Sequence, residues 1–308
     1  MAKTLLSFYC DDTNPYCAPP AAFGQFLEYA RARGIAGEAS LIPAFDWAAH
    51  GTMIPAGAPE QAAFLALAAR ANDCGIETNF ELMTHAGRYD FAAARIPAGA
   101  QHEGVWLYEP AVGAEEYQAY FAGILAAGDQ AGVRYSGMTW PGCGCADCER
   151  RYAELRAQGV TEPNPNVWRA LLTLAQAGRF RGRVVPCFFG GAVEGCPVRV
   201  TASGGGCAVL DLPPNAEDRL ALWLNDPAYA DADYYISANG RAGRIVELVE
   251  SGLPYCLFYA HWQGLNPING VGWPVFTQVV ERVRQHLAEC IAWARPSEIA
   301  EHSLRAQG

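Results

Sequence analysis

Two adjacent carboxylates, Asp11 and Asp12, directly follow the first apolar segment of the chain, in LLSFYCDDTNPY. Two like charges placed at the end of a buried strand repel each other, so something in the site must compensate them. A divalent metal that binds one carboxylate and leaves the other as a base is a good candidate. The alternative is a solvated turn, or Asp side chains that cap the Asn-Pro turn that follows. The pair favours an enzyme over a binding module.

A second motif, ELMTH, places Glu81 and His85 four residues apart at the end of another apolar segment. If that turn is helical, both side chains lie on one face. Together with Asp12 they supply three ligands of the types that a catalytic zinc or similar ion accepts, and a coordination position remains for water. A lone His here would be structural or merely exposed, but its acidic companions favour a metal site.

With these motifs the chain resembles the polysaccharide deacetylase family, carbohydrate esterase family 4. That family begins with a strand that ends in paired Asp residues, as FYCDD does here. The resemblance implies that Asp11 is the general base and Asp12 a metal ligand. It also implies that His85 is the second His of the family's metal motif, with Glu81 in place of the first. The family's last motif, a strand ending in the general-acid His, is matched by CLFYAHWQ at His261.

The chain departs from the family pattern at two places. The Arg that should position the catalytic Asp is absent from MTWPGCG, and Arg241 in NGRAG is the candidate to replace it in space. Glu81 makes the ligand set harder and more negative than the usual one, which shifts the expected metal from zinc towards manganese or iron. Zinc remains the first expectation.

The resemblance implies a hydrolase that removes an N- or O-acetyl group from a carbohydrate or related amide. Trp140 and Trp262, in loops with glycines and polar residues, are expected to contact substrate, as is Glu109 after the segment Val105–Tyr108. Core filling is the alternative for the aromatic residues. The rival functions are a glycoside hydrolase that uses Asp11 or Asp12 with Glu109, and an inactive relative that binds carbohydrate.

A separable motif, PGCGCADCERRY, holds Cys143, Cys145 and Cys148. Three thiols in six residues bind a structural zinc well if a fourth ligand comes from elsewhere, and Cys74 or Cys187 could supply it. The alternatives are simple thiols or a redox role.

These residues must be positioned by strands that alternate with amphipathic helices, a pattern typical of parallel strands joined by crossover helices. Functional residues then gather at the carboxyl ends of the strands. We therefore expect one distorted (β/α) barrel over residues 1–308, of the glycoside hydrolase and deacetylase type, with seven or eight parallel strands. The strands are expected at Thr4–Cys10, Glu38–Ile42, Ile76–Leu82, Val105–Tyr108, Val184–Phe189, Cys207–Leu212, Tyr234–Ser237 and Tyr255–Tyr259.

Helices are expected between them. The clearest, Val275–Trp293, has a stripe of apolar residues at spacings of three and four. The others are expected at Ala21–Arg33, Pro59–Cys74, Glu115–Ala131, Asn166–Ala177 and Arg241–Ser251.

Composition limits the class of substrate and the location. With 22 Lys and Arg against 32 Asp and Glu, the net charge of −10 argues against nucleic acid as a partner. A small-molecule or oligosaccharide substrate of little charge is more natural. We expect no membrane span and no signal peptide, which makes the cytoplasm the default location. The eleven Cys are then better explained as thiols or metal ligands than as disulfides.

Overall fold

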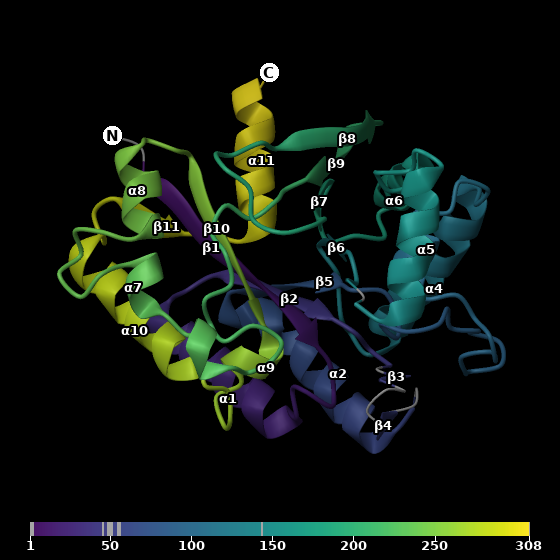
Figure 1. The fold of residues 1–308 in the computed structure, drawn as a ribbon, viewed down its shortest axis with the longest axis horizontal. Helices are drawn as coiled ribbons and strands as arrows, with labels where there is room; N and C mark the ends of the chain where they lie inside the picture. The colour runs from purple at the N-terminus through teal and green to yellow at the C-terminus, as the bar shows by residue number, and fades with distance from the viewer. Residues whose placement is uncertain (1–2, 45, 48–51, 54–56, 143, 308) are drawn as a thin grey trace.

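A curled, mostly parallel sheet forms the centre of the molecule (Figure 1). The computed structural model describes residues 3–44, 46–47, 52–53, 57–142 and 144–307. The strands of the main sheet are β1 (Thr4–Thr13), β2 (Gly37–Leu41), β5 (Ile76–Phe80), β6 (Gly137–Thr139), β7 (Val184–Phe188), β8 (Arg199–Gly204), β9 (Cys207–Asp211), β10 (Tyr255–His261) and β11 (Ile291–Trp293). A separate two-stranded sheet pairs β3 (Asp46–Trp47) with β4 (Thr52–Met53).

The main sheet has nine strands in the order β10-β1-β2-β5-β6-β7-β9-β8, and β11 also pairs with β1. Only β8 is antiparallel to its neighbour, so eight of the nine described strands are parallel. The chain after β9 bridges back to β10, where Ala216 pairs with Phe258 and the Asn215 side chain accepts a hydrogen bond of 2.8 Å from the Leu257 N–H. The predicted distorted (β/α) barrel is confirmed.

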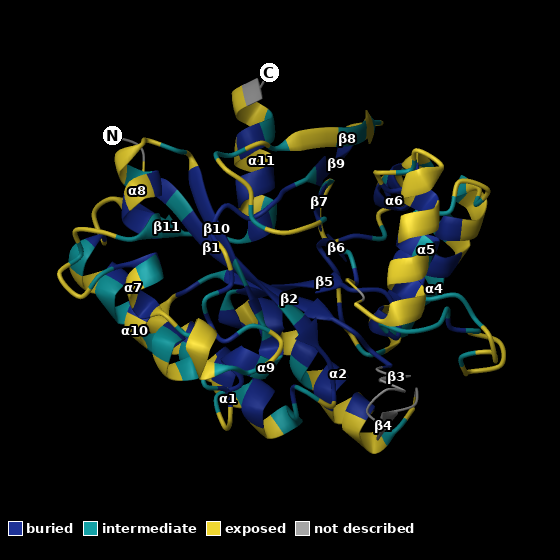
Figure 2. Ribbon diagram, in the orientation of Figure 1, coloured by how far each residue is buried: buried dark blue, intermediate teal, exposed yellow. Residues whose placement is uncertain are grey.

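Alternation along β1 divides the core into an outer and an inner layer. Phe8 points outwards, where its ring meets Phe26 and Phe276 on the surrounding helices at 6.1 and 5.3 Å. Tyr9 points inwards and stacks at 4.3 Å on Phe188 of β7, a strand that is not a neighbour of β1 in the sheet. This contact crosses the barrel interior, and Figure 2 shows β1, β10 and β5 largely buried, whereas the edge strand β8 is mostly exposed.

Helices cover the outside of the sheet and close one end of it. The longer ones are α1 (Pro20–Arg33), α2 (Pro59–Ala71), α4 (Ala114–Gln130), α5 (Ala146–Ala157), α6 (Pro165–Gln176), α8 (Arg244–Glu250), α10 (Trp273–His286) and α11 (Pro296–Gln307); the short ones are α3 (Glu103–Trp106), α7 (Ala232–Tyr235) and α9 (Trp262–Leu265). Helix α11 packs Ile299 and Ala300 against the inner core layer, and the Ser297 hydroxyl donates a 2.6 Å hydrogen bond to Glu77. No helix of the described chain is long and apolar enough to cross a membrane.

Some predicted elements are wrong. Val105–Tyr108 and Tyr234–Ser237 are not strands, because the first overlaps α3 and the second overlaps α7, and side chains of His102 and Asp231 cap these short helices. The predicted helix Val275–Trp293 ends at His286, and its last residues form β11. The sequence does not predict strand β6, because three residues that begin with Gly137 are too short to show a strand pattern.

Candidate active site

The Asp pair lies where β1 leaves regular pairing. The β1–β2 register shifts between Cys10 and Thr13, and Asp12 has a φ of 59°, a left-handed backbone conformation that costs a non-glycine residue energy. The Asp12 N–H donates a 2.9 Å hydrogen bond to Glu81 Oε2. The side chains of Asp11 and Asp12 therefore do not follow the alternation of an ordinary strand, and both carboxylates stay at the carboxyl end of β1.

Three side chains from two strand ends form a group with metal-ligand chemistry. Asp12, Glu81 and His85 each offer a donor atom, and these atoms lie within 4.8 Å of one another. His85 Nε2 is 3.2 Å from Glu81 Oε1 and 3.5 Å from Asp12 Oδ1. Among the described residues, no other group of three such ligands is found. The predicted ligand set is thus brought together.

The electrostatics of this group fit a bound cation. Burial, followed by the charge of Glu81, raises the pKa of Asp11, and burial, followed by the charge of Asp12, raises the pKa of Glu81. Asp11 Oδ1 and Glu81 Oε1 are buried and accept no hydrogen bond from the described residues. A divalent cation would supply the positive charge that these carboxylates lack. Two carboxylates and one imidazole suit zinc, manganese or iron.

The turn that carries His85 is not helical, so Glu81 and His85 are not brought together by a helix face. Leu82 and His85 both have positive φ, of 56° and 55°. The buried Glu103 carboxylate holds the turn by accepting hydrogen bonds from the N–H groups of Met83, Thr84 and His85 at 3.1, 3.0 and 2.8 Å. Glu103 gives no signal in the sequence, because the segment that carries it is distant and lacks a recognisable motif.

His261 ends β10 beside Asp11, and the two residues are register partners in the parallel β1–β10 pair. Its Nδ1 lies 2.7 Å from Oδ2 of Asp218, whose side chain is fully buried. Burial alone would lower the pKa of His261, but the hydrogen bond to Asp218 and the charge of Asp11 outweigh it and raise the pKa to about 9. His261 is therefore protonated near neutral pH and can donate a proton.

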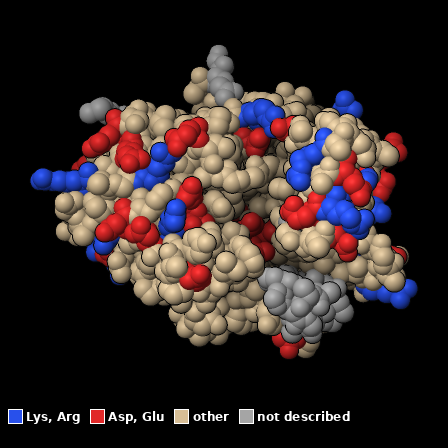
Figure 3. Space-filling view, in the orientation of Figure 1, with Lys and Arg blue, Asp and Glu red and all other residues tan. Residues whose placement is uncertain are grey.

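Two further polar residues of the site were missed by sequence reasoning. Asp218 lies six residues after the predicted strand Cys207–Leu212. An acidic residue shortly after a strand is the one sequence signal that could have pointed to it. Gln263 donates a 2.9 Å hydrogen bond to Asp12 Oδ2. Acidic side chains are visible in a hollow near the centre of the face drawn in Figure 3.

The structure contradicts the substrate-binding role expected for Trp262. The side chain is fully buried and packs edge-on against Phe23 and Phe26 at 5.5 and 5.3 Å. It fills the core between the barrel and α1. The physical reason is that β10 ends at His261 and the chain turns at once into α9, whose first residue faces inwards.

Glu109 and Arg241 are not brought to the Asp pair either. Glu109 is held by Arg151, whose Nε and Nη2 donate hydrogen bonds of 2.8 Å to its two carboxylate oxygens and lower its pKa. Arg241 is exposed in the turn before α8, and no contact within the described residues joins its guanidinium to Asp11. Neither takes the place predicted for it.

Trp140 follows β6 and is partly buried. Its indole N–H donates a 3.2 Å hydrogen bond to the carbonyl of Gly104, next to the Glu103 that holds the His85 turn. Trp140 is thus close in the fold to the segment that supports the ligand group.

The predicted structural zinc rests partly on Cys143, which lies outside the described residues. Cys145 caps α5, and its Sγ accepts a hydrogen bond from the Cys148 N–H. The suggested fourth ligands, Cys74 and Cys187, are buried elsewhere. In the part of the chain that is described, these Cys residues do not form a group of three metal ligands.

Comparisons with known proteins find similarity only at the level of structure. No family model and no curated protein matches the chain. A protein assigned as a polysaccharide deacetylase from Mycobacterium smegmatis is 13% identical, with a TM-score of 0.49 over 100% of this chain and 92% of that one. A probable polysaccharide deacetylase from Pseudomonas aeruginosa PAO1 is 10% identical, with a TM-score of 0.46 over 98% and 90%.

The Xyl-CE4 domain of a multidomain xylanase from the hindgut metagenome of Trinervitermes trinervoides is also 10% identical, with a TM-score of 0.46 over 98% of this chain and 92% of that one. Two of these solved structures are named as polysaccharide deacetylases and the third as a CE4 domain, all at low identity to this chain. Similarity at this level carries no inference about activity, so the function has to be argued from the side chains.

Proposed function

We propose that the protein is a metal-dependent hydrolase of the polysaccharide deacetylase type, which removes an N- or O-acetyl group from a carbohydrate or related amide. The observation that carries the proposal is one arrangement of side chains. The donor atoms of Asp12, Glu81 and His85 lie within 4.8 Å of one another, and Asp11 and His261 stand beside them on adjacent strands. We further propose that residues 1–308 act as one catalytic unit.

Asp12, Glu81 and His85 would hold the metal, which we propose to be zinc, with manganese or iron as alternatives. When bound, a divalent cation supplies Lewis acidity for an acyl carbonyl and lowers the pKa of water. Gln263 fixes the Asp12 carboxylate through its 2.9 Å hydrogen bond. Glu103 fixes the backbone of the His85 turn.

Asp11 would act as the general base. One of its carboxylate oxygens is buried and accepts no hydrogen bond from the described residues, and Asp11 lies in β1 next to the ligand Asp12. This oxygen can accept the proton of the water that attacks the acyl carbon.

His261 would act as the general acid. Its pKa of about 9 keeps the ring protonated at neutral pH, and Asp218 at 2.7 Å holds Nδ1 so that Nε2 can face the substrate. A protonated imidazole can transfer its proton to the departing amine or alcohol, which completes the hydrolysis. A glycoside hydrolase that relies on Glu109 is disfavoured, because Arg151 engages both oxygens of that carboxylate.

The test combines metal analysis with acetate release. Wild-type protein should bind one divalent ion at this site and release acetate from a member of an acetylated oligosaccharide panel. Asp12→Ala and His85→Ala should lose the ion and the activity together. Asp129→Ala, an exposed acid paired with Arg179, is the matched control and should keep both.

If both ligand variants keep the full complement of site metal, the proposed site is wrong. Any ion at the Cys motif must be counted separately, for example with Cys145→Ser and Cys148→Ser. Saccharide binding without acetate release from the metal-loaded wild type would instead indicate the inactive carbohydrate-binding alternative.

A further inference from the structure

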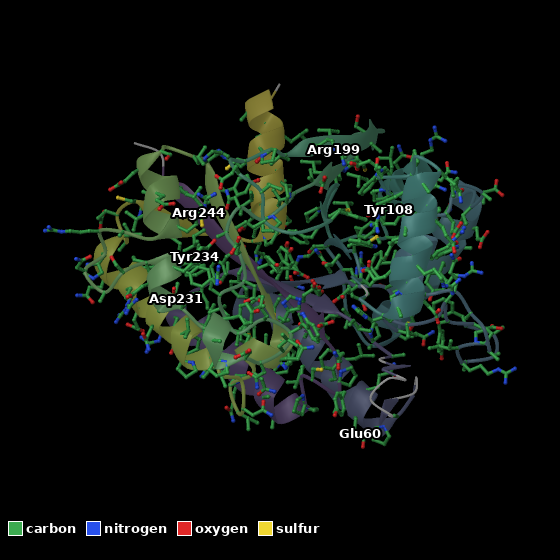
Figure 4. All side chains as sticks on the ribbon, viewed as in Figure 1. Glu60, Tyr108, Arg199, Asp231, Tyr234 and Arg244 are labelled. Atoms are coloured by element: carbon green, nitrogen blue, oxygen red, sulfur yellow. The ribbon has the colours of Figure 1, made fainter. Side chains whose placement is uncertain are left out.

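A cavity of about 400 Å³ lies next to α5, beyond the residues that carry the proposed chemistry. Its size falls in the lower part of the range of small-molecule sites, roughly 300–1,000 Å³. Three aromatic rings contact one another in its wall. Tyr108 lies 5.3 Å from Trp140 and 5.7 Å from Tyr152, and Trp140 lies 6.0 Å from Tyr152, measured between ring centroids. Figure 4 shows Tyr108 on the same side of the molecule as α5 and α6.

One face of α5 supplies the polar part of the wall. Glu149 and Arg156 both line the cavity, and a spacing of seven residues places them on the same helix face with Tyr152 between them. Both side chains are exposed, and neither has an ion pair or side-chain hydrogen bond within the described residues. In contrast, Arg150 and Arg151 on the same helix are paired with acids. The cavity therefore offers one free acceptor group and one free donor group.

The cavity is connected to the ligand group through a short segment. Trp140, in the cavity wall, donates its indole N–H to the carbonyl of Gly104. The two residues before Gly104 support the metal-binding turn, where His102 Nε2 lies 3.1 Å from the His85 carbonyl and Glu103 accepts the His85 N–H. Trp140 thus links the cavity wall to the segment that holds the His85 turn.

The chemistry of the wall favours a particular class of ligand. Aromatic side chains present flat apolar surfaces, while a carboxylate accepts hydrogen bonds and a guanidinium donates them. The charges of Glu149 and Arg156 sum to zero. The polar wall therefore favours neither an anionic nor a cationic ligand. An uncharged ring that carries several hydroxyl groups can stack on the aromatic side chains, donate a hydrogen bond to the carboxylate and accept one from the guanidinium.

We propose that this cavity is a saccharide subsite, which binds an uncharged sugar unit next to the acetylated one. Tyr108 and Trp140 form its apolar wall, and Glu149 and Arg156 bind hydroxyl groups. The proposal rests on the proposed function and extends it, because it makes the protein selective for oligosaccharides over single acetylated sugars.

The experiment compares substrates of different length. Metal-loaded wild type, Glu149→Ala and Arg156→Ala are assayed for acetate release from acetylated glucosamine and xylose oligomers of one to six units. Each variant should raise KM for the longer oligomers about tenfold, the effect of losing a hydrogen bond to a charged group. The value of kcat, and the KM for single units, should not change. Arg150→Ala is the matched control, since Arg150 lies on the same helix and pairs with Asp147 instead.

The proposal is overturned if Arg156→Ala and Glu149→Ala behave as Arg150→Ala does, or if wild-type KM does not depend on oligomer length. If wild type releases no acetate from any oligomer, the proposed function fails, and the subsite is judged by binding alone through quenching of tryptophan fluorescence. Saturable binding that Arg156→Ala weakens and Arg150→Ala does not would support the subsite. Absence of saturable binding would overturn it.

Discussion

Replacing Asp218 by Asn tests whether the partner of His261 sets the pH range of activity. The hydrogen bond that His261 donates to Asp218 is the largest of the influences that raise the His261 pKa from its ordinary 6.5 to about 9. Without that carboxylate, mainly the charges of Asp11 and Asp12 oppose the effect of burial, so the pKa should fall towards its ordinary 6.5. At pH 8 the protonated fraction would drop from about 90% to about 3%, roughly a thirtyfold loss of the competent acid.

The assay is the pH dependence of kcat/KM for acetate release, with metal at saturation. Wild type should lose activity on the alkaline side near pH 9, and Asp218→Asn should lose it near pH 6.5. Bound metal should be unchanged, because Asp218 is not among the ligand group. Asp129→Asn is an exposed control that should leave the profile unaltered. An alkaline limb that stays near pH 9 in folded Asp218→Asn would refute the assignment of His261 as the acid.

Three further perturbations separate the remaining roles. Asp11→Asn should keep the metal but lower kcat for acetate release about 10²–10⁴-fold; undiminished turnover would remove Asp11 as the base. Glu103→Gln should weaken metal binding about 10–100-fold in a calorimetric titration, because it loosens the His85 turn, and unchanged affinity would show that the turn holds without it. Burial raises the pKa of Glu77 from 4.5 to about 7. Since the folded-state pKa of Glu77 lies above the unfolded one, ionisation of Glu77 lowers the free energy of unfolding of the wild type as pH rises from 4.5 through 7. Over this range the free energy of unfolding of Glu77→Gln should rise by up to about 3 kcal/mol relative to that of the wild type. Urea unfolding at pH 4.5 and 8 measures this gain, and an equal difference at both pH values would contradict it.

The parts of the fold that could be predicted are those with a strong local pattern. Strand β1 is a short continuous apolar run and helix α10 has apolar residues at spacings of three and four, so the type of both elements could be predicted, although α10 ends at His286. Short segments do not carry such a signal. Val105–Tyr108 is as apolar as a strand, but a helical turn wins because the His102 side chain accepts the Gly104 N–H. Strand β6 depends on Gly137, where any Cβ would lie 1.9 Å from the Pro186 carbonyl oxygen.

For the site, the sequence by itself determined the residue types that can bind a metal and move protons, because Asp11, Asp12, Glu81 and His85 stand at the ends of apolar segments. Only the tertiary structure decided which of the other polar residues join them. Asp218 approaches His261 because the chain after β9 crosses to β10, and Glu103 reaches His85 from a distant segment. Trp262 is buried and Glu109 is taken by Arg151 for the same reason: partners distant in sequence are chosen by packing, and no local pattern records that choice.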